Sequence, residues 1–143
     1  MANDLRTLGK RMNALADSIP KRANELKKKV VMTIVSDLAY STPVDTSQAI
    51  SNYQVNTVRP ETAIKAHFQG ERGSTYQASA RETIDRTRTF LETVQPGQAV
   101  YISNVLPYII PLNDGSSTQE PAGFIERAVL LGRKEIVKFR LLK

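Results

Sequence analysis

The chain has 143 residues, the usual size of a single domain, and it contains no cysteine. This composition excludes disulfide bonds, zinc–thiolate sites and a cysteine nucleophile. The net charge is +6, and aromatic residues are few (five Tyr, four Phe and no Trp), so we expect one domain with a mainly aliphatic core.

The positive charge is concentrated at the two ends of the chain. Residues 1–35 carry eight basic side chains against three acidic ones, and residues 126–143 carry six against two. Both blocks fall on predicted helices, so they form either a positive face for a polyanion or an ordinary solvated helix surface. No apolar run reaches 18 residues and the first residues do not resemble a signal peptide, so we expect a soluble, cytoplasmically made protein with no membrane partner.

Two helices are predicted within residues 1–40. Apolar residues in the first alternate steps of three and four, the spacing of one helical face. They are Leu5, Leu8, Met12, Leu15 and Ile19. Proline lacks the amide that a helix interior requires, so we expect a break at Ser18-Ile19-Pro20. The second helix continues to about Ala39, carries Lys27, Lys28 and Lys29 together near its middle, and has an apolar face wide enough to lie on a sheet.

A small, mainly antiparallel sheet is expected from residues 50–69 and 98–113. Its strand candidates show alternating apolar residues. They are Tyr53, Val55 and Thr57, then Ile64, Ala66 and Phe68, then Val100 and Ile102. Between the two blocks, Ser74 and Gln77 have the spacing of a capping box, which predicts a helix over 74–94. Its apolar face is thin, so we expect it to be peripheral.

The last part of the chain is predicted to bend, turn and end in a helix. Pro107-Tyr108-Ile109-Ile110-Pro111-Leu112 reads as an apolar loop with rigid ends that crosses the sheet edge. A turn at 113–117 follows, and Pro121 suits the first position of a helix over 121–140. The expected fold class is therefore α+β, with N-terminal helices and a C-terminal helix packed on a small sheet.

Catalytic and metal-binding patterns are weak in this sequence. His67 is the only histidine, and without Cys or a second His it indicates an ordinary strand residue rather than a metal ligand. Asp45, Asp114 and Glu120 are too far apart in sequence to indicate a carboxylate pair. We therefore expect no enzyme activity and no cofactor.

Two blocks of the sequence form a distinctive pattern. The first is Thr42-Pro43-Val44-Asp45-Thr46, followed by Ser47. The second combines a strand that ends in Asn, a Pro-Tyr pair, a Gly-Ser turn and a helix entry. It comprises Ile102-Ser103-Asn104, Pro107-Tyr108, Leu112-Asn113-Asp114-Gly115-Ser116 and Pro121-Ala122-Gly123-Phe124. Together the two blocks resemble the tail-completion or neck-protein family of tailed bacteriophages (HK97 gp10-like), whose pattern commonly has glycine at the position of Ser47.

The resemblance implies a virion structural protein without enzyme activity. Such a subunit assembles as a homo-oligomeric ring, expected to be a hexamer, at the head–tail junction, between neck or connector proteins and tail-tube proteins. A tail terminator that caps the tail tube is a close alternative, because it too is a small ring-forming α+β protein.

Two surfaces are the candidate sites of such a ring. Residues Pro107–Leu112 either contact a neighbouring subunit or fill the chain's own core. Lys27–Lys29 would face a DNA-carrying lumen and contact the genome transiently and without sequence specificity. A non-specific DNA-binding module, which acts through the basic helices alone, is the alternative from another functional class.

Overall fold

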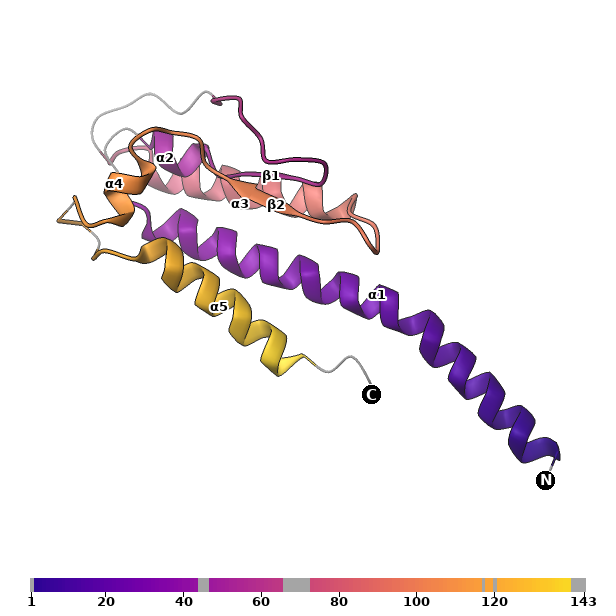
Figure 1. Cartoon of the computed structure of the whole chain (residues 1–143). Helices are drawn as coiled ribbons and strands as arrows, with labels where there is room; N and C mark the ends of the chain where they lie inside the picture. Colours follow the sequence, from indigo (N-terminus) through magenta and orange to yellow (C-terminus); the bar gives the residue numbers. More distant parts are fainter. Residues whose placement is uncertain (1, 44–46, 66–72, 117, 120, 140–143) are drawn as a thin grey trace.

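The structure is a computed structural model that describes residues 2–43, 47–65, 73–116, 118–119 and 121–139. In these residues the chain is mostly helical (Figure 1). The elements in chain order are α1 (Ala2–Ser41), α2 (Gln48–Ser51), β1 (Gln54–Asn56), α3 (Tyr76–Glu92), β2 (Tyr101–Ser103), α4 (Ile109–Asn113) and α5 (Phe124–Lys138). The second half of α1 lies between α5 on one side and α3 with the strands on the other.

The core is built around this second half of α1. Towards α5, Leu38 belongs to a buried cluster that includes Phe124 and Ala128. Towards α3, Val31 and Val35 pack with Leu91 and Val94. The apolar face predicted for this helix is thus divided between two neighbouring helices, with Val55 and Ile102 of the two strands packed against the cluster on the α3 side.

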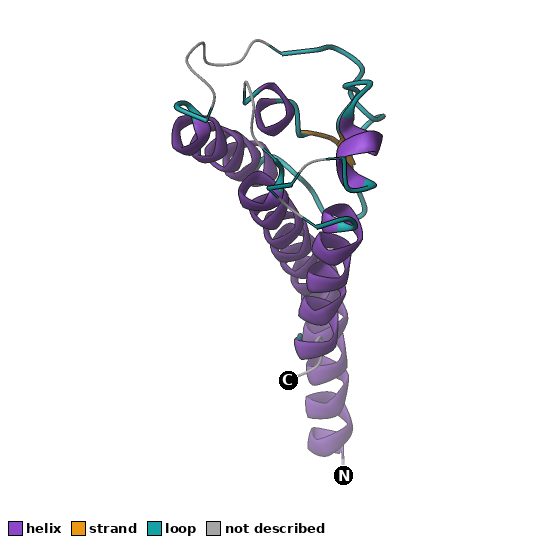
Figure 2. Ribbon diagram, turned by 90° about the vertical axis from the view of Figure 1, so that its left-hand side faces the viewer, coloured by secondary structure: helices purple, strands orange, loops and turns teal. Residues whose placement is uncertain are grey.

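The predicted break in the N-terminal helices is wrong. α1 is one helix of 40 residues with Pro20 inside it. Proline removes one amide hydrogen bond and crowds the preceding turn, which bends a helix when the residues on both sides favour it. The N-terminal part of α1 accordingly runs at an angle to the rest and projects beyond the remainder of the molecule (Figures 1 and 2). We call residues 2–19 the arm.

The sheet is much smaller than expected. β1 and β2 form an antiparallel pair in which Val55 faces Ile102, so these two strand predictions are confirmed. Ile64 is 58% exposed and lies outside any strand, while Ala66, His67 and Phe68 lie outside the described residues. The expected α+β fold is therefore confirmed only in part, as a mostly helical fold with a two-stranded ribbon.

Hydrogen bonds from two side chains hold residues 61–65 beside β1 without a strand ladder. The Asn52 side chain accepts a hydrogen bond from the Lys65 amide at 2.8 Å, and the Gln54 side chain donates one to the Ala63 carbonyl at 2.6 Å. Because these amides satisfy backbone groups that a ladder would otherwise need, the 61–65 segment stays attached without forming a strand.

The helix predicted over 74–94 is confirmed as α3, but it is less peripheral than expected. Its inner face includes Thr83 and Thr87, which are buried because their hydroxyls donate to backbone carbonyls at 2.9 and 2.8 Å. The predicted capping box is wrong: Thr75 is the N-cap and makes no side-chain cap bond. The Thr75 hydroxyl donates instead to the Ser47 hydroxyl at 2.7 Å.

The C-terminal third differs from the prediction in two places. The segment expected as an apolar loop contains a short helix, α4, which begins at Ile109. The last helix begins at Phe124 rather than Pro121, with Gly123 as its N-cap in the left-handed region, at φ 86°. Glycine adopts this conformation without steric cost, which favours the later start.

Candidate assembly interface

The predicted interface segment, Pro107–Leu112, divides between core and surface. Ile109 is 5% exposed within the cluster around Phe124, and Leu112 packs against the same cluster. Tyr108 and Ile110 are 37% and 61% exposed. Because a helix places consecutive residues on different faces, α4 fills the chain's own core with one side and presents the other side outward.

Residues of the second sequence block contact residues that directly follow the first block, at the end of the molecule opposite the arm. The Asn104 side chain donates a hydrogen bond to the Ala49 carbonyl at 2.8 Å. The Tyr108 hydroxyl donates one to the Gln48 side chain at 2.9 Å. α2 and α4 therefore form one joined surface, which we call the distal end (Figure 1).

Ser47, which stands where the family pattern commonly has glycine, has φ 64°. The left-handed region costs a residue with a Cβ about 1–2 kcal/mol, so serine keeps a glycine-like turn here at an energetic cost. Pro43 beside this turn is buried, whereas Val44, Asp45 and Thr46 lie outside the described residues.

Asn113 fastens the distal end to the start of α5, a role that the sequence did not reveal. Its side chain donates to both carboxylate oxygens of Glu126, at 3.0 and 2.9 Å, and accepts the Ile125 amide at 2.9 Å. The Asn113 hydrogen bond, followed by a backbone hydrogen bond, lowers the pKa of Glu126. An Asn before Asp-Gly indicates only a local turn, so a partner 12 residues ahead has no sequence signal.

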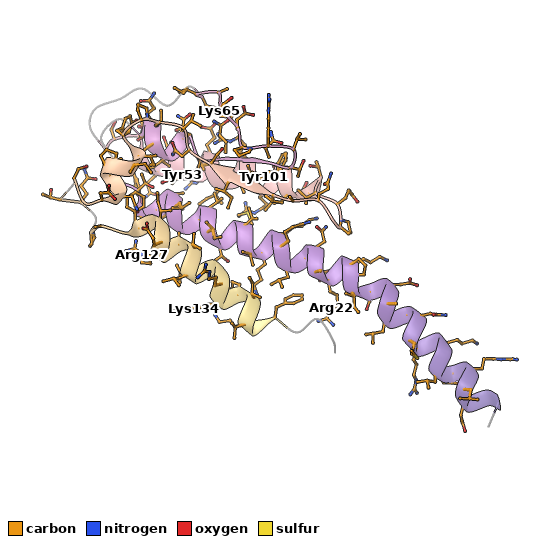
Figure 3. All side chains as sticks on the ribbon, in the orientation of Figure 1. Arg22, Tyr53, Lys65, Tyr101, Arg127 and Lys134 are labelled. Atoms are coloured by element: carbon orange, nitrogen blue, oxygen red, sulfur yellow. The ribbon has the colours of Figure 1, made fainter. Side chains whose placement is uncertain are left out.

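Tyr53 and Thr42 join the end of α1 to β1. Their hydroxyl oxygens lie 2.7 Å apart, and Thr42 also donates to the Leu38 carbonyl at 2.6 Å. Burial raises the pKa of Tyr53 well above its ordinary value. The phenol therefore stays protonated and acts as a buried hydrogen-bonding group (Figure 3).

The three predicted lumen-facing lysines point in different directions. Lys27 donates to the backbone carbonyls of Gln95 and Gln98 at 3.3 and 2.6 Å, at the end of α3. Partial burial and then the charge of Lys28 lower the pKa of Lys27. Lys29 forms an ion pair with Glu135 of α5 at 3.3 Å. Two of the three lysines thus connect α1 to its neighbours.

A basic groove of about 370 Å³ nevertheless runs between α1 and α3. Its lining residues are Lys28, Lys29, Met32, Arg88, Leu91 and Glu92. Three of these six side chains are cationic and one is acidic, and two of the cations form ion pairs, Lys29 with Glu135 and Arg88 with Asp85.

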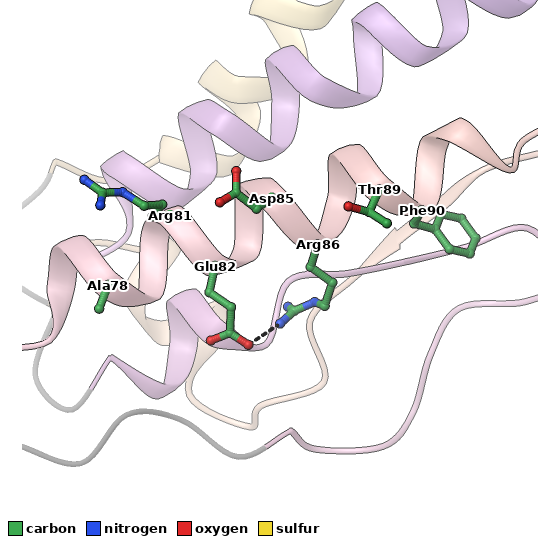
Figure 4. Close-up of a pocket in the computed structure, with 7 residues that line it drawn as sticks. All are labelled: Ala78, Arg81, Glu82, Asp85, Arg86, Thr89 and Phe90. Carbon is green, nitrogen blue, oxygen red and sulfur yellow. Dashed lines mark ion pairs between the residues drawn. The ribbon is translucent and has the colours of Figure 1, made fainter.

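A hollow on the outer face of α3 was a further candidate site (Figure 4). Its central residue, Arg86, donates to the carbonyls of Ser51 and Tyr53 at 2.9 and 3.0 Å and lies 3.5 Å from Glu82. Asp85 pairs with Arg88 on the same helix at 2.8 Å. Arg86 therefore connects α3 to α2 and β1, and ion pairs within one helix are typical of a solvated surface.

The arm exposes a row of large apolar side chains. Its stripe residues are Leu5, Leu8, Met12, Leu15 and Ile19, which are 70%, 52%, 61%, 40% and 37% exposed. The arm itself extends beyond the other elements (Figure 3). A contiguous exposed apolar stripe of this kind indicates a contact surface.

Within the described part of the chain, no three His, Asp or Glu side chains gather as metal ligands, and no helix is long and apolar enough to cross a membrane. Asp114 lies exposed at the end of α4, whereas Asp45 and Glu120 fall outside the described residues. In comparisons with known proteins, no family model, no curated protein and no solved structure matches the chain.

Proposed function

We propose that this chain is a non-enzymatic structural subunit of a tailed-bacteriophage virion. It assembles as a homo-oligomeric ring, expected to be a hexamer, at the head–tail junction, where it joins neck or connector proteins to tail-tube proteins and lets DNA pass. A tail terminator that caps the tail tube is the nearest alternative position. In either role the protein acts by assembly, through contacts of its exposed surfaces rather than through reactive groups.

The observation that carries this proposal is the exposed apolar stripe of the arm. Burying such side chains stabilises association by about 25 cal/mol per Å² of apolar surface removed from water, and an isolated subunit gains none of this. A projecting apolar helix has no evident use in an enzyme that acts as a monomer, whereas it is expected in a subunit whose neighbours cover that helix after assembly.

The distal end supports the choice of family. The two blocks of resemblance lie far apart in sequence, yet Asn104 and Tyr108 contact the residues that directly follow the first block. Ser47 keeps a glycine-like backbone where the family pattern commonly has glycine. Both observations are expected if the blocks form one surface with a shared purpose.

Deletion of the gene from its phage, followed by electron microscopy of the lysate, tests the proposal. We expect filled heads lying beside separate tails, because a missing junction ring leaves both parts complete but unjoined. Tails of irregular length would place the protein at the tail terminus instead. Intact particles with normal tails would contradict both positions.

The exposed side of α4 allows a sharper test in the complemented deletion. Ile110→Asp changes a side chain that is 61% exposed, so we expect a folded subunit that fails to restore phage titre. Ile109→Asp, at 5% exposure, is the comparison that unfolds the core. A normal titre with Ile110→Asp and Tyr108→Ala would remove α4 from the interface.

Non-specific DNA binding is the second candidate, and the basic groove between α1 and α3 favours it. The ion pairs of Lys29 with Glu135 and of Arg88 with Asp85 compete with phosphate contact there. Each neutralised phosphate adds a salt-sensitive share of affinity, so we expect only weak binding that is lost as salt is raised from about 50 to 200 mM. Affinity that persists at the higher salt would move this candidate to first place.

A further inference from the structure

The arm and the covered part of α1 belong to one continuous stripe. The alternating steps of three and four that relate Leu5 to Ile19 continue through Arg22, Leu26 and Lys29. This 3.5-residue spacing is the seam of a helix that packs lengthwise against another helix. We therefore expect a helical partner to pack along the whole length of the stripe, not only along its second half.

α5 is the helix that covers the second half of this stripe. The Arg22 guanidinium lies 5.5 Å from the centre of the Phe139 ring, and Lys29 pairs with Glu135 at 3.3 Å. Farther along, Gly132 permits close contact with Val30 and Ile34. α5 ends at Lys138, and the arm continues beyond it (Figure 1).

α5 also carries a second set of apolar side chains that stay exposed in the subunit. They are Val129, Leu130, Ile136 and Val137, which are 38%, 54%, 51% and 86% exposed. Leu130 and Val137 are two turns apart on the side opposite the buried Phe124 and Ala128. We call these four residues the outer face of α5.

We propose that the arm of one subunit docks lengthwise on the outer face of α5 in a second copy of this chain. The contact repeats between subunits the α1–α5 pairing that already exists within one subunit. The lengths agree: α5 has 15 residues and the arm spans residues 2–19, so each is roughly 22–27 Å long at 1.5 Å per residue.

A head-to-tail contact fits both surfaces better than pairing of two arms. If two arms paired with each other, the symmetric dimer would be closed and the outer face of α5 would stay exposed. When an arm binds α5, the pair still offers one free arm and one free α5, so the contact repeats, and it closes into a ring when the rotation between copies brings the last copy back to the first. This inference rests on the proposed ring and names the contact that builds it.

The test uses the purified full chain and two exposed-site variants. Met12→Asp places a charge on the arm, and Val137→Asp places one on the outer face of α5; their exposures of 61% and 86% leave the core untouched. Asn13→Asp puts the same charge on the arm away from the stripe and serves as the matched control. Circular dichroism checks that all three variants keep their helices.

Sedimentation velocity then measures association at concentrations up to about 1 mM, the range of a weak contact. We expect oligomers for the wild type and for Asn13→Asp, and monomers for Met12→Asp and for Val137→Asp. An equal mixture of the two monomeric variants should form a dimer, because one supplies an intact α5 face and the other an intact arm.

Three results would overturn the contact. They are a monomeric wild type at the highest concentration, a Val137→Asp variant that still forms oligomers, or a mixture that stays monomeric. The contact and the proposed function fail separately. If the deletion lysate contains unjoined heads and tails but Met12→Asp still forms oligomers, the contact alone is rejected. If the protein associates in solution but the deletion particles are intact, the junction role alone is rejected.

Discussion

Gly132 is the point where α5 comes closest to α1. A Cβ at this position would lie 2.7 and 2.8 Å from Cγ1 and Cδ1 of Ile34. We expect Gly132→Ala to lower the free energy of unfolding by about 1–3 kcal/mol, because the overpacking outweighs the better helix propensity of alanine. Urea denaturation followed by circular dichroism measures the change. Gly9→Ala is the control: nothing lies within 4 Å of its Cβ, so it should stabilise the arm helix instead.

Glu126 gives the fold a dependence on acid. Hydrogen bonds from Asn113 and from the backbone lower its pKa in the folded state below the ordinary value of 4.5. The stabilisation is therefore complete above that ordinary value and disappears as the pH falls through the lower, folded-state pKa. We expect Glu126→Gln to flatten the decline in unfolding midpoint below about pH 5, measured by thermal denaturation across pH. An unchanged acid slope would show that other carboxylates dominate.

At the scale of elements, Pro20 sets the direction of the arm. Alanine restores the missing amide and removes the clash, and the proline costs a helix interior about 3 kcal/mol. We expect Pro20→Ala to raise helicity and thermal stability while it lowers phage titre, because the straightened arm no longer meets its neighbour. Circular dichroism and complementation measure the two effects. Pro60→Ala, in an exposed loop, should change neither; a full titre with Pro20→Ala would mean that the bend is unimportant.

Periodic patterns predicted α3 and the paired strands well, although α1 continues through the break expected at Pro20. α3 was predicted within two residues at each end, and Val55 and Ile102 were placed on strands that do pair. The prediction failed where distant side chains decide local structure. The side chains of Asn52 and Gln54 form hydrogen bonds with the backbone of Lys65 and Ala63, in place of a strand ladder. Gly123 is the N-cap of α5, so this helix begins three residues after Pro121. Neither effect leaves a periodic signal.

At the scale of the whole molecule, the sequence revealed surfaces but not their partners. The spacing from Leu5 to Ile19 was visible, yet the same spacing is equally compatible with burial inside one chain. Only the structure shows that α5 ends at Lys138 and leaves this part of the stripe exposed. Two of the six residues of the predicted interface, Ile109 and Leu112, likewise pack in or against the core.

The arm's exposure has a consequence for its own stability. Most helical stability in proteins comes from packing of an amphipathic face, and the arm, with its stripe exposed and Pro20 at its base, gains little from the core. We expect the arm's amides to exchange with deuterium within seconds in the dilute monomer, since they open locally without unfolding the rest. Docking on a neighbouring α5 adds packing to the arm, so exchange should slow at least tenfold at concentrations where the protein assembles.

Hydrogen exchange with mass spectrometry at low and high protein concentration measures this difference. Amides around Val35 and Leu91, which are buried in the core, are the internal reference and should exchange slowly at both concentrations. In Met12→Asp, the arm should exchange rapidly at both, because the charge prevents docking without reaching the core. Equal protection of the wild-type arm in monomer and oligomer would instead mean that the arm is stable by itself and that assembly uses another surface.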